Sequence, residues 1–113
     1  MKTHTNGPTA QGELYIRRID SLPTGLELVA PEGGHVIVGH SETGHHHVMD
    51  AETTTMYRAP KEIFELFLTV TKDTRLTHLR PFDTHEPIIL PTGNYIVRRQ
   101  REYTPEGWRR AAD

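Results

Sequence analysis

The chain has 113 residues, a length that fits one domain and leaves no room for two independent cores. It contains no cysteine, which excludes disulfides and thiolate metal ligands, and its net charge of −2 argues against a general nucleic-acid binder. Only 35% of the residues are hydrophobic, so we expect a metal or a partner subunit to add to the stability of the core.

The sequence lacks an apolar run of about 18 residues that could span a bilayer, and residues 1–8 lack the hydrophobic stretch of a signal peptide. We therefore expect a cytoplasmic protein without a membrane segment. Residues 1–12 are polar and rich in Gly, Pro and Thr, which predicts a flexible N-terminal segment. A single β-rich, metal-binding domain is expected over residues 13–113.

Short apolar stretches separated by turn residues fill the first half of this domain. The expected strands are 14–19, 26–29, 35–40, 45–49 and 53–58. Turn residues at 41–44 make the third and fourth of these strands a hairpin. A spacing of about 8 to 12 residues predicts a small antiparallel β-barrel or sandwich.

Residues 60–71 fit either a helix or a strand. Pro60 suits a helix start, and apolar residues at 63, 67 and 70 follow helical spacing. Strict alternation of apolar residues is found at Phe64, Leu66, Leu68 and Val70. Because the run also ends in β-branched residues, we predict a strand.

The remaining strands are expected at 76–80, 88–90 and 95–103. After them, Thr104 suits an N-cap, Pro105 the first position of a helix and Glu106 its first turn. This pattern predicts a short C-terminal helix that carries Trp108.

Eight histidines are the most informative feature of the sequence. His45 and His47 are two residues apart, and such residues point to the same face of a strand, where both can reach one ion at about 2.0–2.1 Å. His78 and His85, from a later part of the sheet, are expected to complete the ligand set. His40, at the other end of the hairpin turn, is an alternative ligand.

Imidazole ligands suit Zn²⁺ best here, with Fe²⁺, Ni²⁺ or Cu²⁺ as alternatives. Three protein ligands leave a position for a water molecule whose pKa falls towards about 7, whereas four ligands indicate a structural site, and the sequence allows both. A catalytic site would hydrate or hydrolyse a small-molecule substrate, as a carbonic-anhydrase-like lyase does, with Glu86 or His40 as the proton carrier. The second interpretation is a non-catalytic accessory module that holds a structural metal or none, and both interpretations are compatible with a homo-oligomer.

Arginines gather on the last expected strand, at Arg98, Arg99 and Arg101. We interpret them as a solvated edge strand, where charge discourages pairing with other chains. An anion clamp for a carboxylate or phosphate is the alternative, because the guanidinium group matches such anions.

Residues 43–47 fit a T-G-H-x-H pattern, and residues 99–106 fit R-Q-R-E-Y-x-P-E. Together they resemble a family of small, uncharacterised proteins of bacterial and phage genomes, over most of residues 13–113. That resemblance implies no activity. The His-x-His pair is also loosely similar to that of cupins, which bind a metal in a small β-barrel, but the glutamate that cupins place shortly after it is at best Glu52.

Overall fold

The computed structural model describes residues 2–3, 9–11, 14–39, 46–78, 87–99, 101–104 and 107–110. These residues form strands β1 (Lys2–Thr3), β2 (Thr9–Gln11), β3 (Leu14–Ile19), β4 (Glu27–Val29), β5 (His35–Gly39), β6 (His47–Asp50), β7 (Thr54–Ala59), β8 (Glu62–Val70), β9 (Thr74–His78), β10 (Ile88–Leu90), β11 (Gly93–Arg99), β12 (Arg101–Thr104) and β13 (Gly107–Arg110).

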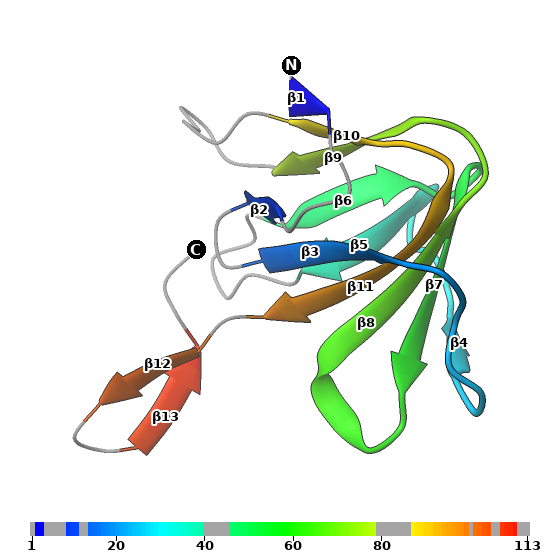
Figure 1. Cartoon of the computed structure of the whole chain (residues 1–113). Helices are drawn as coiled ribbons and strands as arrows, with labels where there is room; N and C mark the ends of the chain where they lie inside the picture. Colours follow the sequence, from blue (N-terminus) through cyan, green and yellow to red (C-terminus); the bar gives the residue numbers. More distant parts are fainter. Residues whose placement is uncertain are drawn as a thin grey trace.

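The strands build two large sheets and one separate two-stranded ribbon (Figure 1). One sheet has the order β1-β10-β9-β6-β5 and the other the order β2-β3-β11-β8-β7-β4, while β12 pairs only with β13. Every ladder is antiparallel except the short one between β1 and β10. Neither sheet closes on itself, so the prediction of a mainly β fold is confirmed in its sandwich form.

A single hydrophobic core lies between the two sheets. Its buried members, which both sheets contribute, are Leu14, Ile16, Val36, Val38, Met49, Met56, Leu68, Val70, Leu76, Ile88, Leu90, Tyr95 and Val97. On β3 and β9 these residues alternate with exposed ones, the pattern of a strand with one face in the core and one in water.

Residues 60–71 form a strand, as predicted, because β8 spans most of them. Leu68 and Val70 belong to the core, and Phe67, which precedes Leu68, faces the outer side of the six-stranded sheet. Phe67 is only 4% exposed there, although it is not part of the core cluster. The helical reading fails because it requires residues 67 and 70 to share a face, whereas a strand places them on opposite faces.

Three predictions for the C-terminal part are wrong. The strand expected over 95–103 is divided between β11, which lies in the large sheet, and β12, which lies in the ribbon. β11 pairs with both β3 and β8, so it is a central strand and not the expected edge strand. Residues 107–110 form β13 where a helix was expected.

Residues 1–12, predicted to be a flexible segment, contribute β1 and β2 to the sheets. β1 runs along β10, and β2 extends the six-stranded sheet beyond β3. Among the described residues, no helix has the length and apolar character needed to cross a membrane.

Tyr95 is a core residue that contacts an arginine and a neighbouring turn. Tyr95 is fully buried and donates a hydrogen bond from its hydroxyl to the carbonyl of Pro91 at 2.6 Å. Arg18 lies 5.9 Å from the centre of the Tyr95 ring and donates a hydrogen bond from Nη2 to the carbonyl of Thr92 at 2.6 Å. Burial raises the pKa of the Tyr95 hydroxyl, and the positive charge of Arg18 opposes this rise.

Candidate functional site

His47, one of the predicted metal ligands, lies at the start of β6 and is fully buried. Because it is two residues from Met49, the two side chains share the face of β6 that is directed into the core. Burying an imidazole is unfavourable unless its polar atoms are satisfied. His47 is therefore the best-placed candidate among the described residues.

A bulge in β5 gives the His47 ring its space. The register with β6 moves from Ile37↔Val48 to Gly39↔His47, so β5 uses one more residue than β6 over this stretch. A Cβ atom built on Gly39 would lie 3.1 Å from Cδ2 of His47 and 3.0 Å from Cδ2 of Leu14. Gly39 was not among the predicted site residues, although a glycine between a β-branched run and a histidine is a typical signal of close backbone approach.

His78, a second predicted ligand, is the last residue of β9 and pairs with His47 across the β6–β9 ladder. Alternation along β9 assigns position 78 to the same face as Leu76, which belongs to the core. The sheet therefore brings together two histidines that are far apart in the sequence, at facing positions on its inner side.

The other candidates are not paired with these two within the described residues. His40, His45, His85 and Glu86 lie outside the residues that the structure describes. His35 is exposed at the start of β5, and His46 is half-buried just before β6. In the described part of the chain, no group of three or more His, Asp or Glu side chains is arranged to hold a metal ion.

A hollow of about 490 Å³ lies on the five-stranded sheet and the adjoining loop, and His47 is not among its lining residues. Its charged lining residues are His35, Asp50, Lys72, Asp73 and Arg75. Asp50 already accepts a hydrogen bond from the backbone N–H of Glu52 at 2.8 Å. Acids and bases are mixed in this hollow, so its charge selects neither an anion nor a cation.

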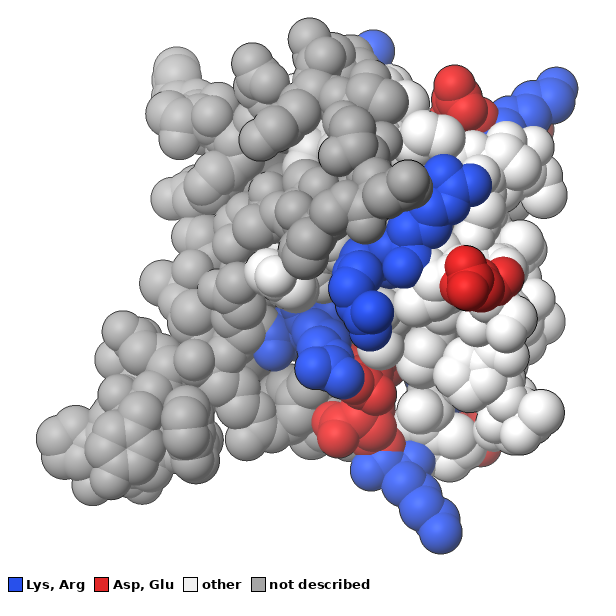
Figure 2. Space-filling model, viewed as in Figure 1, with Lys and Arg blue, Asp and Glu red and all other residues white. Residues whose placement is uncertain are grey.

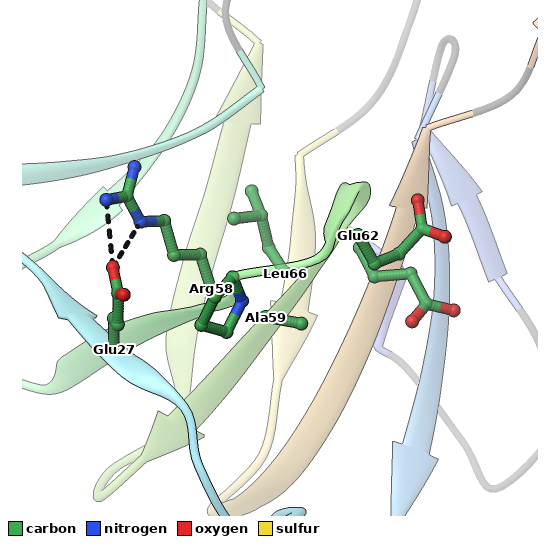
Figure 3. Close-up of a pocket in the computed structure, with 7 residues that line it drawn as sticks. Glu27, Arg58, Ala59, Glu62 and Leu66 are labelled. Carbon is green, nitrogen blue, oxygen red and sulfur yellow. Dashed lines mark hydrogen bonds and ion pairs between the residues drawn. The ribbon is translucent and has the colours of Figure 1, made fainter.

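A second hollow, of about 300 Å³, lies beside the turn between β7 and β8 (Figure 3). Arg58 turns towards Glu27 and donates hydrogen bonds from Nε and Nη2 to one of its carboxylate oxygens, at 3.0 and 2.9 Å. The Glu62 carboxylate points away from this pair in the same view. The arginine and the glutamate thus satisfy each other, and no predicted site residue lines this hollow.

Comparison with known proteins identifies the family of this chain. No curated protein and no solved structure matches it. A family model described as a domain of unknown function, DUF8820, matches residues 10–100, which include both large sheets except β1 and the first residue of β2. The prediction of an uncharacterised family is confirmed at this level, and the chain belongs to the DUF8820 family.

Proposed function

We propose that this protein binds a divalent metal ion through histidines held between its two sheets, with His47 and His78 as two of the ligands. The observation that supports this most is the β6–β9 register, which pairs the two residues. Directly opposite residues of an antiparallel ladder have Cβ atoms about 4.5–5.5 Å apart, so both imidazoles can bind one ion with bonds of about 2.0–2.1 Å.

The surroundings of His47 also support a metal ligand. The ring is fully buried, and a Cβ atom built on Gly39 would lie 3.1 Å from its Cδ2 and 3.0 Å from Cδ2 of Leu14. An apolar shell of this kind limits the access of solvent to a metal and strengthens the electrostatic attraction between the ion and its ligands.

The ligand set needs at least one more residue, which we propose to be His45, His85 or His40. His40 directly follows β5, whose last residue pairs with His47, while His45 comes two residues before β6 and His85 three residues before β10. A set of three or four imidazoles suits Zn²⁺ best, with Fe²⁺, Ni²⁺ or Cu²⁺ as alternatives.

A site with three histidines would support hydration or hydrolysis of a small molecule. The ion would bind a water molecule and lower its pKa to about 7, and Glu86 or His40 would carry away the proton that this water releases. We also propose that the protein is cytoplasmic, and that the two sequence motifs reflect kinship with bacterial and phage proteins. The proposal includes the loose similarity to cupins.

A structural metal in a non-catalytic accessory module is the second candidate. The complete burial of His47 favours it, because a catalytic ion needs an open position that a substrate can reach. X-ray absorption spectroscopy of the loaded protein distinguishes the two candidates. Four nitrogen ligands would indicate the structural site, and three nitrogens with one oxygen would indicate the catalytic one.

The main experiment is elemental analysis of untagged protein that has never been in contact with nickel resin. We expect about one transition-metal ion per chain in the wild type and a loss of most of it in His47→Ala and in His78→Ala. His35→Ala is the matched control, because His35 is exposed and should leave the metal content unchanged. Full metal content in either test variant, or a wild type that takes up none of the four metals, would overturn the proposal.

A further inference from the structure

Strands β6 and β9 stop pairing before either strand ends. The last pair of their ladder is Val48↔Thr77. In the same register Asp50 would face Arg75, and both strands extend as far as these residues. The ladder does not contain this pair, although the structure describes both residues. The five-stranded sheet is therefore open between Asp50 and Arg75.

The hollow of about 490 Å³ lies at this opening. Asp50 lines it from β6 and Arg75 lines it from β9, while Thr53, Lys72 and Asp73 line it from the adjoining loops. Sites for small molecules typically have volumes of about 300–1,000 Å³. The opening of the sheet thus provides a hollow of the size that a small ligand needs.

Asp50 and Arg75 lie on the outer face of the five-stranded sheet. Each is exposed and is adjacent along its strand to a core residue, Met49 on β6 and Leu76 on β9. An acid and a base at facing positions of a ladder normally form a favourable cross-strand pair. Here the two strands have separated, and neither Asp50 nor Arg75 forms an ion pair with any described residue. Both charges are therefore available to a ligand.

The turn between β8 and β9 adds one more charge of each sign to the hollow. Lys72 and Asp73 are consecutive and exposed, and within the described part of the chain neither belongs to an ion pair. The lining thus holds two acids and two bases that do not neutralise one another. An anion or a cation alone would meet like charges as well as opposite ones, whereas a ligand with both charges can satisfy both kinds of side chain.

Hydrogen bonds fix the loops that surround the hollow. Thr74 donates from Oγ1 to the carbonyl of Lys72 at 2.6 Å. Because this bond uses its one hydroxyl hydrogen, Thr53 is the donor in the 2.6 Å bond between the Thr53 and Thr74 hydroxyls. The Asp50 carboxylate is oriented by the backbone N–H of Glu52, which donates to Oδ1 at 2.8 Å. A site that is already ordered loses less entropy when it binds a ligand.

We propose that this hollow binds a small zwitterion, a molecule with one ammonium group and one carboxylate, as in free amino acids and short peptides. The ligand carboxylate binds the Arg75 guanidinium, whose planar fork matches two oxygens, and the ligand ammonium binds the Asp50 carboxylate. Lys72 and Asp73 offer the same two kinds of charge at the turn. None of the proposed metal ligands lines the hollow, so this proposal does not depend on the metal site.

The experiment uses glycine, diglycine and triglycine, in which the two charges are increasingly far apart. Each is titrated into the full-length protein in EDTA at low salt, and binding is followed by NMR. We expect the best ligand to bind at least about tenfold more tightly than its N-acetyl form, which lacks the cation, and its amide form, which lacks the anion. Tightest binding of glycine would identify free amino acids, and tightest binding of a longer ligand would identify short peptides. No binding of any of them, or equal binding of a blocked form, would overturn the proposal.

Asp50→Asn and Arg75→Gln test the two charges of the site separately. Asparagine keeps the oxygen that accepts the hydrogen bond from Glu52, so the loop keeps its bond. Each variant should bind the best zwitterion about tenfold more weakly than the wild type does. In Asp50→Asn the zwitterion should bind no better than its N-acetyl form, and in Arg75→Gln no better than its amide form. A zwitterion that keeps its advantage over these forms in both variants would contradict the assignment.

Arg17→Gln and Asp20→Asn are the matched controls, because both residues are exposed and lie on or directly after β3, in the other sheet. Figure 2 shows basic side chains gathered in a band on the side of the molecule where β3 lies, which is another place that attracts anions. We expect either control to change the affinity by less than about twofold. Equal losses in Arg17→Gln and Arg75→Gln would show general attraction of anions and overturn the proposal. Thermal unfolding of all variants checks that the sandwich is intact.

Discussion

His47 and His78 face each other across the β6–β9 ladder, although 30 residues separate them in the sequence. Their positions lie on the inner side of the five-stranded sheet, where His47 is fully buried. Two strands from different parts of the chain thus pair two histidines in one ladder. The first predictions concern what this arrangement does to stability.

Removing the proposed metal should destabilise the wild type. An ion that binds the folded chain alone adds about 2.7 kcal/mol to the free energy of unfolding at a concentration 100 times its Kd, so EDTA should lower the Tm by about 4 °C or more. The same treatment should leave the Tm of His47→Ala unchanged, while His35→Ala should respond like the wild type. Calorimetry with and without the chelator makes the comparison. An identical response of His47→Ala and the wild type would contradict His47 as a ligand.

Gly39→Ala should lower the free energy of unfolding by about 1–3 kcal/mol, because the new methyl group would crowd both His47 and Leu14. In a Leu14→Ala background two of the three close contacts are absent, so the loss caused by Gly39→Ala should shrink by about 1 kcal/mol. Urea unfolding of the four proteins gives this difference. Equal losses in both backgrounds would show that the glycine serves the bulge itself and not the space around the side chains.

Much of the sandwich was predictable from the sequence, because most of its strands have one face in the core and so alternate with a period of two. β3 shows this pattern clearly, and both β3 and β8 were predicted close to their observed bounds. Alternation cannot show where a chain leaves one sheet and enters another. The pattern continues from Arg99 to Arg101 although β11 and β12 belong to different sheets.

The missing C-terminal helix has a local explanation. Thr104, Pro105 and Glu106 fit a helix start, but a proline followed two residues later by Gly107 equally suits the second and fourth positions of a β-turn. The aromatic residues Tyr103 and Trp108 on either side favour strands. The observed pairing of Thr104 with Gly107 is that of a hairpin.

The candidate site was predictable only in part. The number and spacing of the histidines drew attention to His47 and His78, but their partnership depends on the β6–β9 register, which a sequence without known loop lengths does not determine. The register makes His78 the partner of the first residue of β6, and residues 79–80 of the expected strand lie outside the described residues.

Tyr95→Phe should destabilise the protein at neutral pH by about 1 kcal/mol, because the hydrogen bond to Pro91 is lost.

The variant should also change how the free energy of unfolding responds to alkali. Burial raises the pKa of Tyr95 in the folded chain, so its stabilising contribution is complete below the unfolded-state pKa of about 10 and is lost as pH rises through the higher folded-state pKa. Denaturant unfolding between pH 8 and pH 12 should therefore show a smaller decline in the variant. Tyr15→Phe, at the surface, should follow the wild type, and a decline equal to that of the wild type in Tyr95→Phe would contradict the prediction.

Two ion pairs on the six-stranded sheet should differ in strength because they differ in burial. The Arg58 and Glu27 side chains are 63% and 50% exposed, so Glu27→Gln should cost less than about 1 kcal/mol, and this cost should disappear near 1 M NaCl, where the screening length is about 3 Å. The Glu65 side chain is only 22% exposed and lies 2.7 Å from Arg98, so Glu65→Gln should cost more and retain more of its effect in salt.

Glu32→Gln, which removes an exposed acid without a side-chain partner among the described residues, provides the baseline. The comparison requires urea unfolding of the three variants at low and high salt. A cost for Glu27→Gln that equals that of Glu65→Gln, or that survives in 1 M NaCl, would show that burial does not control the strength of these pairs.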